Sequence, residues 1–242
     1  MRDPRPEIVA ERFKGIRRIV AVSSGKGGVG KSIVATTLAL TLAKTGGRVG
    51  LLDLDFTSPS THVILGAEGL HPEEERGIVP PVVHNIRYMS IVYYSVDEPV
   101  PLRGADVSNA LIELLAVTLW GELDYLIIDM PPGIGDATLD LLRLIPRISF
   151  LVVTTPSRVA FESVRKLLLL LRETSTPVLG VVENMATKSL GYIRDKVEGL
   201  HFRYLGSLAF DPEIEDAIGD PAKLMATNFA KEIKGLSKKV SA

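Results

Sequence analysis

The stretch Gly25-Lys26-Gly27-Gly28-Val29-Gly30-Lys31-Ser32 decides the fold class of this 242-residue chain. It matches the phosphate-loop pattern G-x-x-x-x-G-K-S/T, in which glycine N–H groups surround phosphate oxygens without Cβ atoms in the way. In such a loop Lys31 reaches the β- and γ-phosphates, and the Ser32 hydroxyl lies on Mg²⁺. We therefore predict that this stretch binds ATP or ADP together with Mg²⁺. Lys26 has no evident role inside a single chain.

The flanking sequence supplies the strand and the helix that a phosphate loop needs. A short apolar run over 18–23 leads into the loop, and 32–44 has helical spacing and ends at Gly46-Gly47. Further buried strands are predicted at 48–52, 125–129, 148–153 and 177–182, with helices at about 105–120, 135–145 and 158–172. Apolar strands that alternate with helices are typical of a parallel sheet covered on both faces. The sequence therefore predicts one α/β domain over 1–242, with a mostly parallel twisted sheet.

The remaining segments are less regular. Residues 1–17 are predicted to be an N-terminal leader, and 66–86, rich in glycine, proline and charge, an exposed excursion. Further strands are expected over 88–94 and near 203–209, and a final helix near 222–239. One face of that helix carries the apolar residues Phe229, Ile233, Leu236 and Val240. Such a stripe suits a membrane surface, but we favour a helix docked on the domain.

Composition excludes several functional classes. Lys and Arg total 28 and Asp and Glu total 29, so a net charge of -1 gives no global attraction to nucleic acid or to an anionic membrane. No apolar run approaches the ~18–20 residues of a membrane-spanning helix, and no secretion signal is recognisable, so a cytoplasmic location is expected. The absence of cysteine excludes disulfides, thiolate zinc sites and cysteine-ligated iron–sulfur clusters. Scarce thermolabile residues hint at a thermophilic source.

Acidic residues follow two of the predicted strands. Asp129 ends a hydrophobic strand, where a carboxylate can hold the magnesium shell through Ser32 or water. Asp53 and Asp55 lie at the carboxyl end of another strand, the edge at which open α/β sheets bind ligands. We expect Asp55, farther into its loop, to face the attacking water, and Asp53 to lie nearer the magnesium.

One residue is a candidate for recognising the base of the nucleotide. Asn184 comes just past the predicted strand 177–182, where its amide could contact the adenine edge, although a turn-forming role is nearly as plausible. A guanine site of this class needs an Asn/Thr-Lys-x-Asp run. The stretch Thr187-Lys188-Ser189-Leu190 has leucine in place of the aspartate, which disfavours GTP.

Three motifs together resemble the Mrp/MinD family of deviant Walker A ATPases. They are the loop 25–32, the run Asp53-x-Asp55-x-x-x-Pro59-Ser60 and the run Asp129-Met-Pro-Pro-Gly-Ile-Gly-Asp136. The resemblance continues at Arg103-Gly104, Val153–Pro156, Val181–Met185 and Asp211–Ile214, covers nearly the whole chain and is specific to the Mrp/NBP-type branch of iron–sulfur cluster carriers.

The resemblance implies roles for individual residues. It implies a homodimer with ATP at its interface, in which Lys26 reaches the nucleotide of the opposite subunit and Asp55 positions the water. It places residues 25–33, ending at Ile33, on the nucleotide, and Asp211-Pro212 near the base. A cation supplied by a partner subunit is worth roughly 10³–10⁵ in rate.

One departure from the family pattern concerns the iron–sulfur cluster that these carriers hold. Cluster carriers follow Glu-Asn-Met with a Cys-x-x-Cys pair, whereas residues 186–191 here read Ala-Thr-Lys-Ser-Leu-Gly, and Ser157-Arg158 replaces the usual Gln-Asp. A cysteine-free member resembles the archaeal ATPase-type nickel-maturation factors of NiFe hydrogenase. That likeness implies a nickel metallochaperone or another metallocofactor assembly protein as partner, contacting 66–86 and 187–200. The alternatives are an iron–sulfur carrier-type Mrp protein without its own cluster ligands, a MinD/ParA-like positioning ATPase, and a non-hydrolysing nucleotide sensor.

Overall fold

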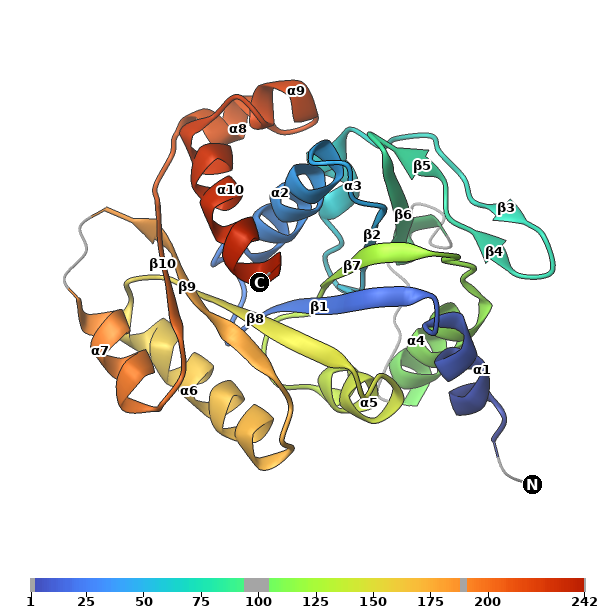
Figure 1. Cartoon of the computed structure of the whole chain (residues 1–242), viewed down its shortest axis with the longest axis horizontal. Coiled ribbons are helices and arrows are strands. Elements are labelled where there is room, and N and C mark those ends of the chain that lie inside the picture. Colours follow the sequence, from blue (N-terminus) through green and yellow to red (C-terminus); the bar gives the residue numbers. More distant parts are fainter. Residues whose placement is uncertain (1–2, 94–104, 188–190, 242) are drawn as a thin grey trace.

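The structure is a computed structural model that describes residues 3–93, 105–187 and 191–241. Its centre is an eight-stranded sheet with the strand order β10-β9-β8-β1-β7-β2-β6-β5 (Figure 1). Neighbouring strands are parallel except for β5 and β6, which are antiparallel. The strands of the described residues are β1 (Ile16–Ser24), β2 (Val49–Asp53), β3 (Glu73–Glu74), β4 (Ile78–Val79), β5 (Val82–Val83), β6 (Ile86–Ser90), β7 (Leu123–Asp129), β8 (Ile148–Thr154), β9 (Val178–Ala186) and β10 (Tyr204–Ala209), of which β3 and β4 pair with each other outside this sheet. The predicted parallel α/β sheet is confirmed.

Helices cover both faces of the sheet because successive residues of its central strands are apolar and point to opposite faces. On β1, Ile19 and Ala21 belong to one hydrophobic core, whereas Val20 and Val22 belong to the other. The helices are α1 (Arg5–Arg12), α2 (Lys31–Lys44), α3 (Thr61–Leu65), α4 (Ala105–Val117), α5 (Asp136–Leu144), α6 (Arg158–Glu173), α7 (Tyr192–Gly199), α8 (Glu213–Ala217), α9 (Pro221–Leu224) and α10 (Asn228–Ser241). The first core lies under α1 and α4–α7, and the second under α2, α3 and α8–α10.

Helix α1 is an element that the sequence analysis does not predict. Val9 and Phe13 are buried beside α4, and Arg12 Nε donates a hydrogen bond to the Ala116 carbonyl oxygen at 3.0 Å. Residues 5–16 of the predicted leader are therefore part of the packed structure.

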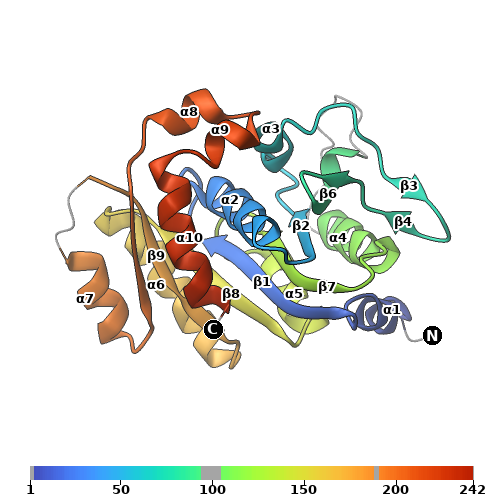
Figure 2. The ribbon, with the colours of Figure 1, turned by 45° about the horizontal axis from the view of Figure 1, so that its top comes forward.

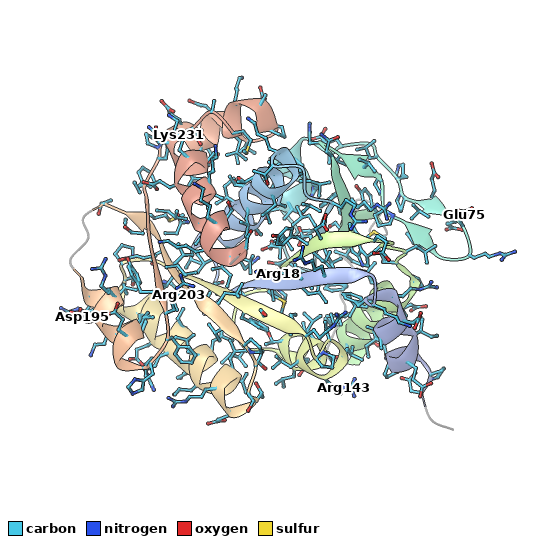
Figure 3. The ribbon with its side chains drawn as sticks, viewed as in Figure 1. Arg18, Glu75, Arg143, Asp195, Arg203 and Lys231 are labelled. Atoms are coloured by element: carbon cyan, nitrogen blue, oxygen red, sulfur yellow. The ribbon has the colours of Figure 1, made fainter. Side chains whose placement is uncertain are left out.

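The segment 66–86, predicted as an exposed excursion, is exposed only in part. Its strands β3 and β4 form a small hairpin that projects from the sheet, with Glu75 at its outer end (Figure 3). The hairpin is tied to the body of the domain because the Leu119 N–H donates a hydrogen bond to the Ile78 carbonyl oxygen at 2.7 Å. Val83, near the end of the segment, is buried in the core.

Several predicted boundaries shift. The strand expected over 88–94 is β6 followed by a short 3₁₀ turn, Ile91–Tyr93. Tyr94, Arg103-Gly104 and residues 188–190 lie outside the described residues.

Two helices replace the single helix predicted near 222–239. α9 ends at Leu224 and α10 begins at Asn228. The break arises because Thr227 caps the second helix, its hydroxyl oxygen accepting a hydrogen bond from the Ala230 N–H at 3.2 Å.

The apolar stripe of α10 packs on the second core, beside α2 (Figure 2). Phe229, Ile233, Leu236 and Val240 are all buried, as a docked helix requires. The last turn is held from below by Arg18, whose guanidinium donates a hydrogen bond to the Val240 carbonyl oxygen at 2.8 Å (Figure 3). Among the residues that the structure describes, no helix combines the length and the apolarity needed to cross a membrane.

The packing of α10 predicts a large effect at one position. We expect Phe229→Ala to lower the free energy of unfolding by ~3–5 kcal/mol, because a fully buried ring leaves a cavity. The exposed Lys238→Ala on the same helix should change it by less than ~0.5 kcal/mol. Urea denaturation of both variants measures this, and equal effects would contradict the docked arrangement.

Candidate nucleotide-binding site

A cavity of about 550 Å³ opens at the carboxyl edge of the sheet, beside the predicted phosphate loop. Asp129 at the end of β7 pairs in register with Val22 of β1 on one side and with Asp53 of β2 on the other. Three neighbouring parallel strands thus end at the same edge and bring their loops together there. The cavity is lined by every predicted phosphate-loop residue except Gly25, and also by Ile33 and Asp55.

The glycines of the loop are present for different structural reasons. Gly28 and Gly30 have φ angles of 76° and 78°, in the left-handed region that favours glycine. Gly25 lies against α6, where an added Cβ would come within 2.5 Å of backbone atoms of Ser163 and Val164. A Cβ on Gly27 would meet nothing within 4 Å. Position 25 therefore sets how the loop leaves the sheet, although its residue does not line the cavity.

Lys31 and Asp129 form a buried ion pair at the floor of the site. The Lys31 Nζ lies 2.6 Å from Asp129 Oδ1 and 3.2 Å from the Ser32 hydroxyl oxygen. The lysine side chain is 7% exposed and the aspartate 0%. Burial raises the pKa of the Asp129 carboxyl, the ammonium of Lys31 opposes that rise, and the neighbouring Asp53 carboxylate adds to it.

The second oxygen of Asp129 makes the site suitable for Mg²⁺. Among the described residues, no hydrogen bond reaches the buried Asp129 Oδ2, and an orphaned buried carboxylate oxygen is costly. The hydroxyl of Ser32 lies beside the same ion pair. Carboxylate and hydroxyl oxygens are ligands that Mg²⁺ prefers, so these residues fit the metal, directly or through water.

The two aspartates after β2 have different surroundings. Asp55 lines the cavity, and its Oδ1 accepts hydrogen bonds from the backbone N–H groups of Thr57 and Ser58 at 3.2 and 3.1 Å. Asp53 does not line the cavity, and both of its oxygens accept hydrogen bonds from the loop that follows. Asp55 thus faces the cavity, whereas Asp53 points into the protein. The roles expected for Asp55 toward the attacking water and for Asp53 near the magnesium stay predictions.

Lys26 lies at the rim of the cavity with an exposed side chain. Its backbone is held in place because the Ser24 hydroxyl donates a hydrogen bond to the Lys26 carbonyl oxygen at 2.9 Å. In the described part of the chain, nothing pairs with its ammonium group. The side chain is therefore available to a group outside its own subunit.

A second hollow of about 170 Å³ adjoins the loop and contains the residues predicted to lie near the base. Ile33 lines both hollows, and Asn184, Asp211 and Pro212 line the second. Asn184 lies within β9, not past its end as the sequence analysis predicts, because the strand continues to Ala186.

Asn184 has a contact that sequence reasoning missed. Its Nδ2 donates a hydrogen bond to the Val29 carbonyl oxygen at 2.9 Å, across 155 positions of sequence. The side chain is 3% exposed and packs against Gly30, where an added Cβ would lie 2.3 Å from its Nδ2. Asn184 thus holds the phosphate loop, and a contact so distant in sequence leaves no local signal.

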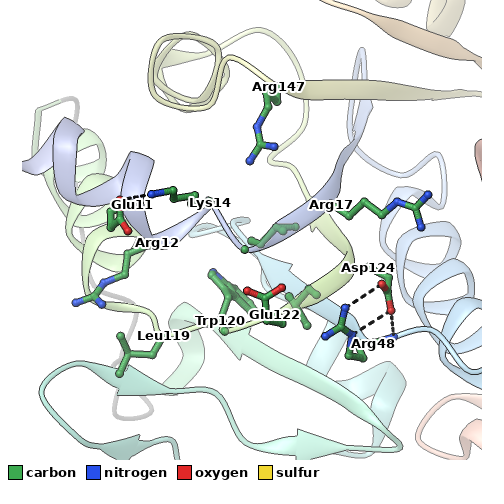
Figure 4. A pocket seen from close by; sticks show the side chains of 14 residues that line it. Glu11, Arg12, Lys14, Arg17, Arg48, Leu119, Trp120, Glu122, Asp124 and Arg147 are labelled. Atoms are coloured by element: carbon green, nitrogen blue, oxygen red, sulfur yellow. Dashed lines mark hydrogen bonds and ion pairs between the residues drawn. The ribbon is translucent and has the colours of Figure 1, made fainter.

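A further hollow of about 870 Å³ lies at the opposite edge of the sheet, beside the amino ends of β1, β2, β7 and β8 (Figure 4). Charges of both signs line it, and several already have partners. Arg48 pairs with Asp124 at 3.2 Å, and its hydrogen bond holds the pKa of that carboxyl below its usual value. Arg147 donates to the Phe13 carbonyl oxygen at 3.1 Å. None of the predicted site residues lies there.

Comparison with known proteins gives similarity over nearly the whole chain. The family model for the NUBPL iron-transfer P-loop NTPases of the ParA group matches residues 15–241. The iron–sulfur cluster carrier protein of Pseudomonas fragi is 47% identical over 175 residues, which are 71% of this chain and 61% of that protein. The iron–sulfur cluster carrier protein of Aquifex aeolicus is 36% identical over an alignment of 260 positions, gaps included, that covers 98% of this chain and 71% of that protein. The chain therefore spans only part of the length of these relatives.

Solved structures share the fold. A nucleotide-binding protein from Archaeoglobus fulgidus, solved in complex with ADP, superposes with a TM-score of 0.79 and 30% identity, over 94% of this chain and 96% of that one. The septum site-determining protein MinD from Pyrococcus horikoshii, solved with Mg-ADP, gives a TM-score of 0.70 and 20% identity over 92% and 95%. At that identity, the second match supports the fold alone.

The close approach of the loop to α6 predicts a difference between two glycines. Gly25→Ala should lower the free energy of unfolding of the nucleotide-free protein by ~1–3 kcal/mol, because its Cβ meets backbone atoms that cannot turn aside. Gly27→Ala should change it by less than ~0.5 kcal/mol. Urea denaturation without nucleotide checks both variants, and equal stabilities would refute the proposed reason for glycine at position 25.

Proposed function

Because the chain belongs to the NUBPL-type iron-transfer P-loop NTPases of the ParA family, we propose that it binds and hydrolyses Mg-ATP as a homodimer. The dimer acts as a nucleotide-dependent switch in the transfer of an iron–sulfur or other metal cofactor. The observation that carries this proposal is the meeting of Lys31, Ser32, Asp129 and Asp55 around one phosphate loop.

Each residue has a role in the proposed hydrolysis. Lys31 exchanges Asp129 for the β- and γ-phosphates, and Ser32 and Asp129 hold Mg²⁺. Mg²⁺ held by Ser32 and Asp129 would supply positive charge against the negative charge that develops during phosphoryl transfer. Asp55 orients the attacking water with the carboxylate oxygen that its own loop does not use. The N–H groups of the loop and of the first turn of α2 surround the phosphates.

The hollow beside the loop suits the base. Asn184 uses its Nδ2 on Val29, which leaves its amide oxygen as an acceptor for the adenine amino group. Phe210 is 59% exposed and Met185 37% exposed at the same hollow, so each can pack on the ring. Asp211 and Pro212 complete the wall.

Lys26 is proposed to act on the nucleotide of the other subunit. Its ammonium is exposed at the rim of its own cavity and pairs with no described side chain. A cation that arrives from a second copy stabilises the transition state only when the dimer has formed. The bound ATP then lies between the two copies of the chain and links them.

The family and the composition support a proposal for the metal cofactor that is transferred. These 242 residues contain no cysteine, so in this proposal the thiolate ligands of the cluster come from another protein. The relatives named above are iron–sulfur cluster carriers, and nothing in these comparisons supports the expected role in nickel maturation of NiFe hydrogenase or a nickel metallochaperone partner. We therefore favour the alternative of a carrier-type protein without its own ligands. The partner footprint is proposed over 66–86 and 187–200.

A MinD/ParA-like positioning role is a weaker candidate. Such a role needs a free amphipathic tail or a basic face for DNA. The apolar stripe of α10 is buried in the second core, and the net charge is -1.

Mixed dimers test the role of Lys26. We expect Lys26→Ala to lower ATP turnover at least ~10³-fold while ADP affinity stays within about twofold, because its charge is needed only in the transition state. Asp55→Asn should also be inactive. An equimolar mixture should recover roughly a quarter of wild-type turnover, because half of the dimers then contain one complete site. Phosphate release measures this, and a mixture without recovery would place Lys26 in its own subunit.

Retention of iron tests the proposed cargo. Reconstitution of the purified chain with iron and sulfide under anaerobic conditions should give no cluster absorbance, since the chain lacks thiolates. When the immobilised protein is incubated with extract of its native source, iron and sulfide should be retained with ATP and not with ADP. The Lys26→Ala variant, which is expected to bind ATP without rapid hydrolysis, should retain iron and sulfide with ATP as the wild type does. Equal retention of iron and sulfide with ATP and with ADP would refute the proposed switch.

A further inference from the structure

One buried carboxylate holds both ends of the loop that carries Asp55. Asp53 Oδ1 accepts a hydrogen bond from the Asp55 backbone N–H at 3.0 Å. Asp53 Oδ2 accepts hydrogen bonds from the backbone N–H groups of Ser60 and Thr61 at 3.3 and 3.2 Å, and from the Thr61 hydroxyl at 2.6 Å. The carboxylate therefore fixes residue 55 relative to residues 60 and 61, across the turn that faces the phosphate cavity.

A tyrosine on the neighbouring strand extends this arrangement. Thr61 Oγ1 lies 2.8 Å from the hydroxyl oxygen of Tyr88 on β6. Because the single hydroxyl proton of Thr61 points to Asp53, Tyr88 is the donor in this second hydrogen bond. Burial and, to a smaller extent, the Asp53 carboxylate raise the pKa of Tyr88, so its hydroxyl keeps the proton that it donates. All three side chains are fully buried, so water does not compete for these bonds.

The position of Asp55 depends on this anchored loop. Asp55 Oδ1 is occupied by the N–H groups of Thr57 and Ser58, and no hydrogen bond from a described residue reaches Oδ2. Since Asp55 lines the cavity, Oδ2 is the atom left for a water molecule. A shift of the loop by a fraction of an ångström would move that atom relative to the γ-phosphate, and such shifts are costly in rate.

We propose that Asp53, Thr61 and Tyr88 form a positioning unit for Asp55, and that Asp53 does not bind the metal. The proposal rests on the proposed ATPase function. Asp53 does not line the phosphate cavity, and its Oδ2 accepts three hydrogen bonds and its Oδ1 one, all from the loop that carries Asp55, so the carboxylate faces that loop and not the cavity. The far end of the unit is held because the Tyr88 ring makes an edge contact with Tyr93, with centroids 5.8 Å apart.

Three substitutions test the unit by its effect on turnover. Tyr88→Phe and Thr61→Val should lower kcat for ATP about tenfold, with the Kd for Mg-ADP within about twofold of wild type. Thr61→Ser keeps the hydroxyl and should retain kcat within about threefold. Unchanged kcat in Tyr88→Phe and Thr61→Val would overturn the proposal, because a purely structural network affects stability alone. If Asp53→Asn weakens ADP binding in the presence of Mg²⁺ but not in EDTA, Asp53 contributes to metal binding and the proposal fails.

Hydrogen exchange separates this proposal from the ATPase function on which it rests. In the nucleotide-free protein, the amides of Asp55, Ser60 and Thr61 should exchange about fivefold faster in Tyr88→Phe than in wild type, because an anchoring hydrogen bond is lost. If the wild type hydrolyses no ATP, the proposed ATPase function is wrong. The exchange rates would still show whether Tyr88 anchors the loop. Exchange that stays at the wild-type rate overturns the anchoring role.

Discussion

The contact between Lys31 and Asp129 is the interaction on which the site depends. It joins the first residue of α2 to the last residue of β7 at 2.6 Å, in a place where both side chains are buried. Removing two charges from water costs several kcal/mol per ion, and a packed apolar pair is often at least as stable. The pair is therefore better explained by function than by folding. Under the proposed function, it keeps Lys31 at the phosphate loop and Asp129 at the metal position until phosphate becomes the partner of the lysine and Mg²⁺ the partner of the carboxylate.

The register of the sheet creates a second buried carboxylate beside the first, because Asp53 pairs with Asp129 on adjacent strands. Two neighbouring carboxylates repel each other, and each needs its own compensation. Asp129 is compensated by a cation that can leave, whereas Asp53 is compensated by four hydrogen bonds from its own loop. The first solution allows exchange with a ligand, and the second gives a rigid support. The carboxyl edge of the sheet therefore has one carboxylate, Asp129, whose partner can be exchanged and one, Asp53, that is held in place.

Sequence reasoning succeeded where the chemistry is local. The glycine loop, the strand before it and the carboxylate of Asp129 follow from short patterns, and the structure brings them together. It failed where distant residues meet. The hydrogen bond from Asn184 to Val29 and the contact of Thr61 with Tyr88 join positions 155 and 27 residues apart. It also missed α1, because one short helix with few apolar residues gives only a weak periodic pattern.

The lack of cysteine constrains how such a switch can work. If the thiolates that hold the cluster lie outside this chain, as proposed, ATP does not act on cluster–thiolate bonds that the chain itself makes. The proposed switch then acts by changing the affinity of the dimer for a protein that holds the metal. A ligand shifts an equilibrium only by its differential affinity for the two states, and that coupling is reciprocal. In the proposed switch, the partner with its metal therefore changes the affinity for nucleotide by the same factor, so that nucleotide binding depends on a metal that the ATP site does not contact.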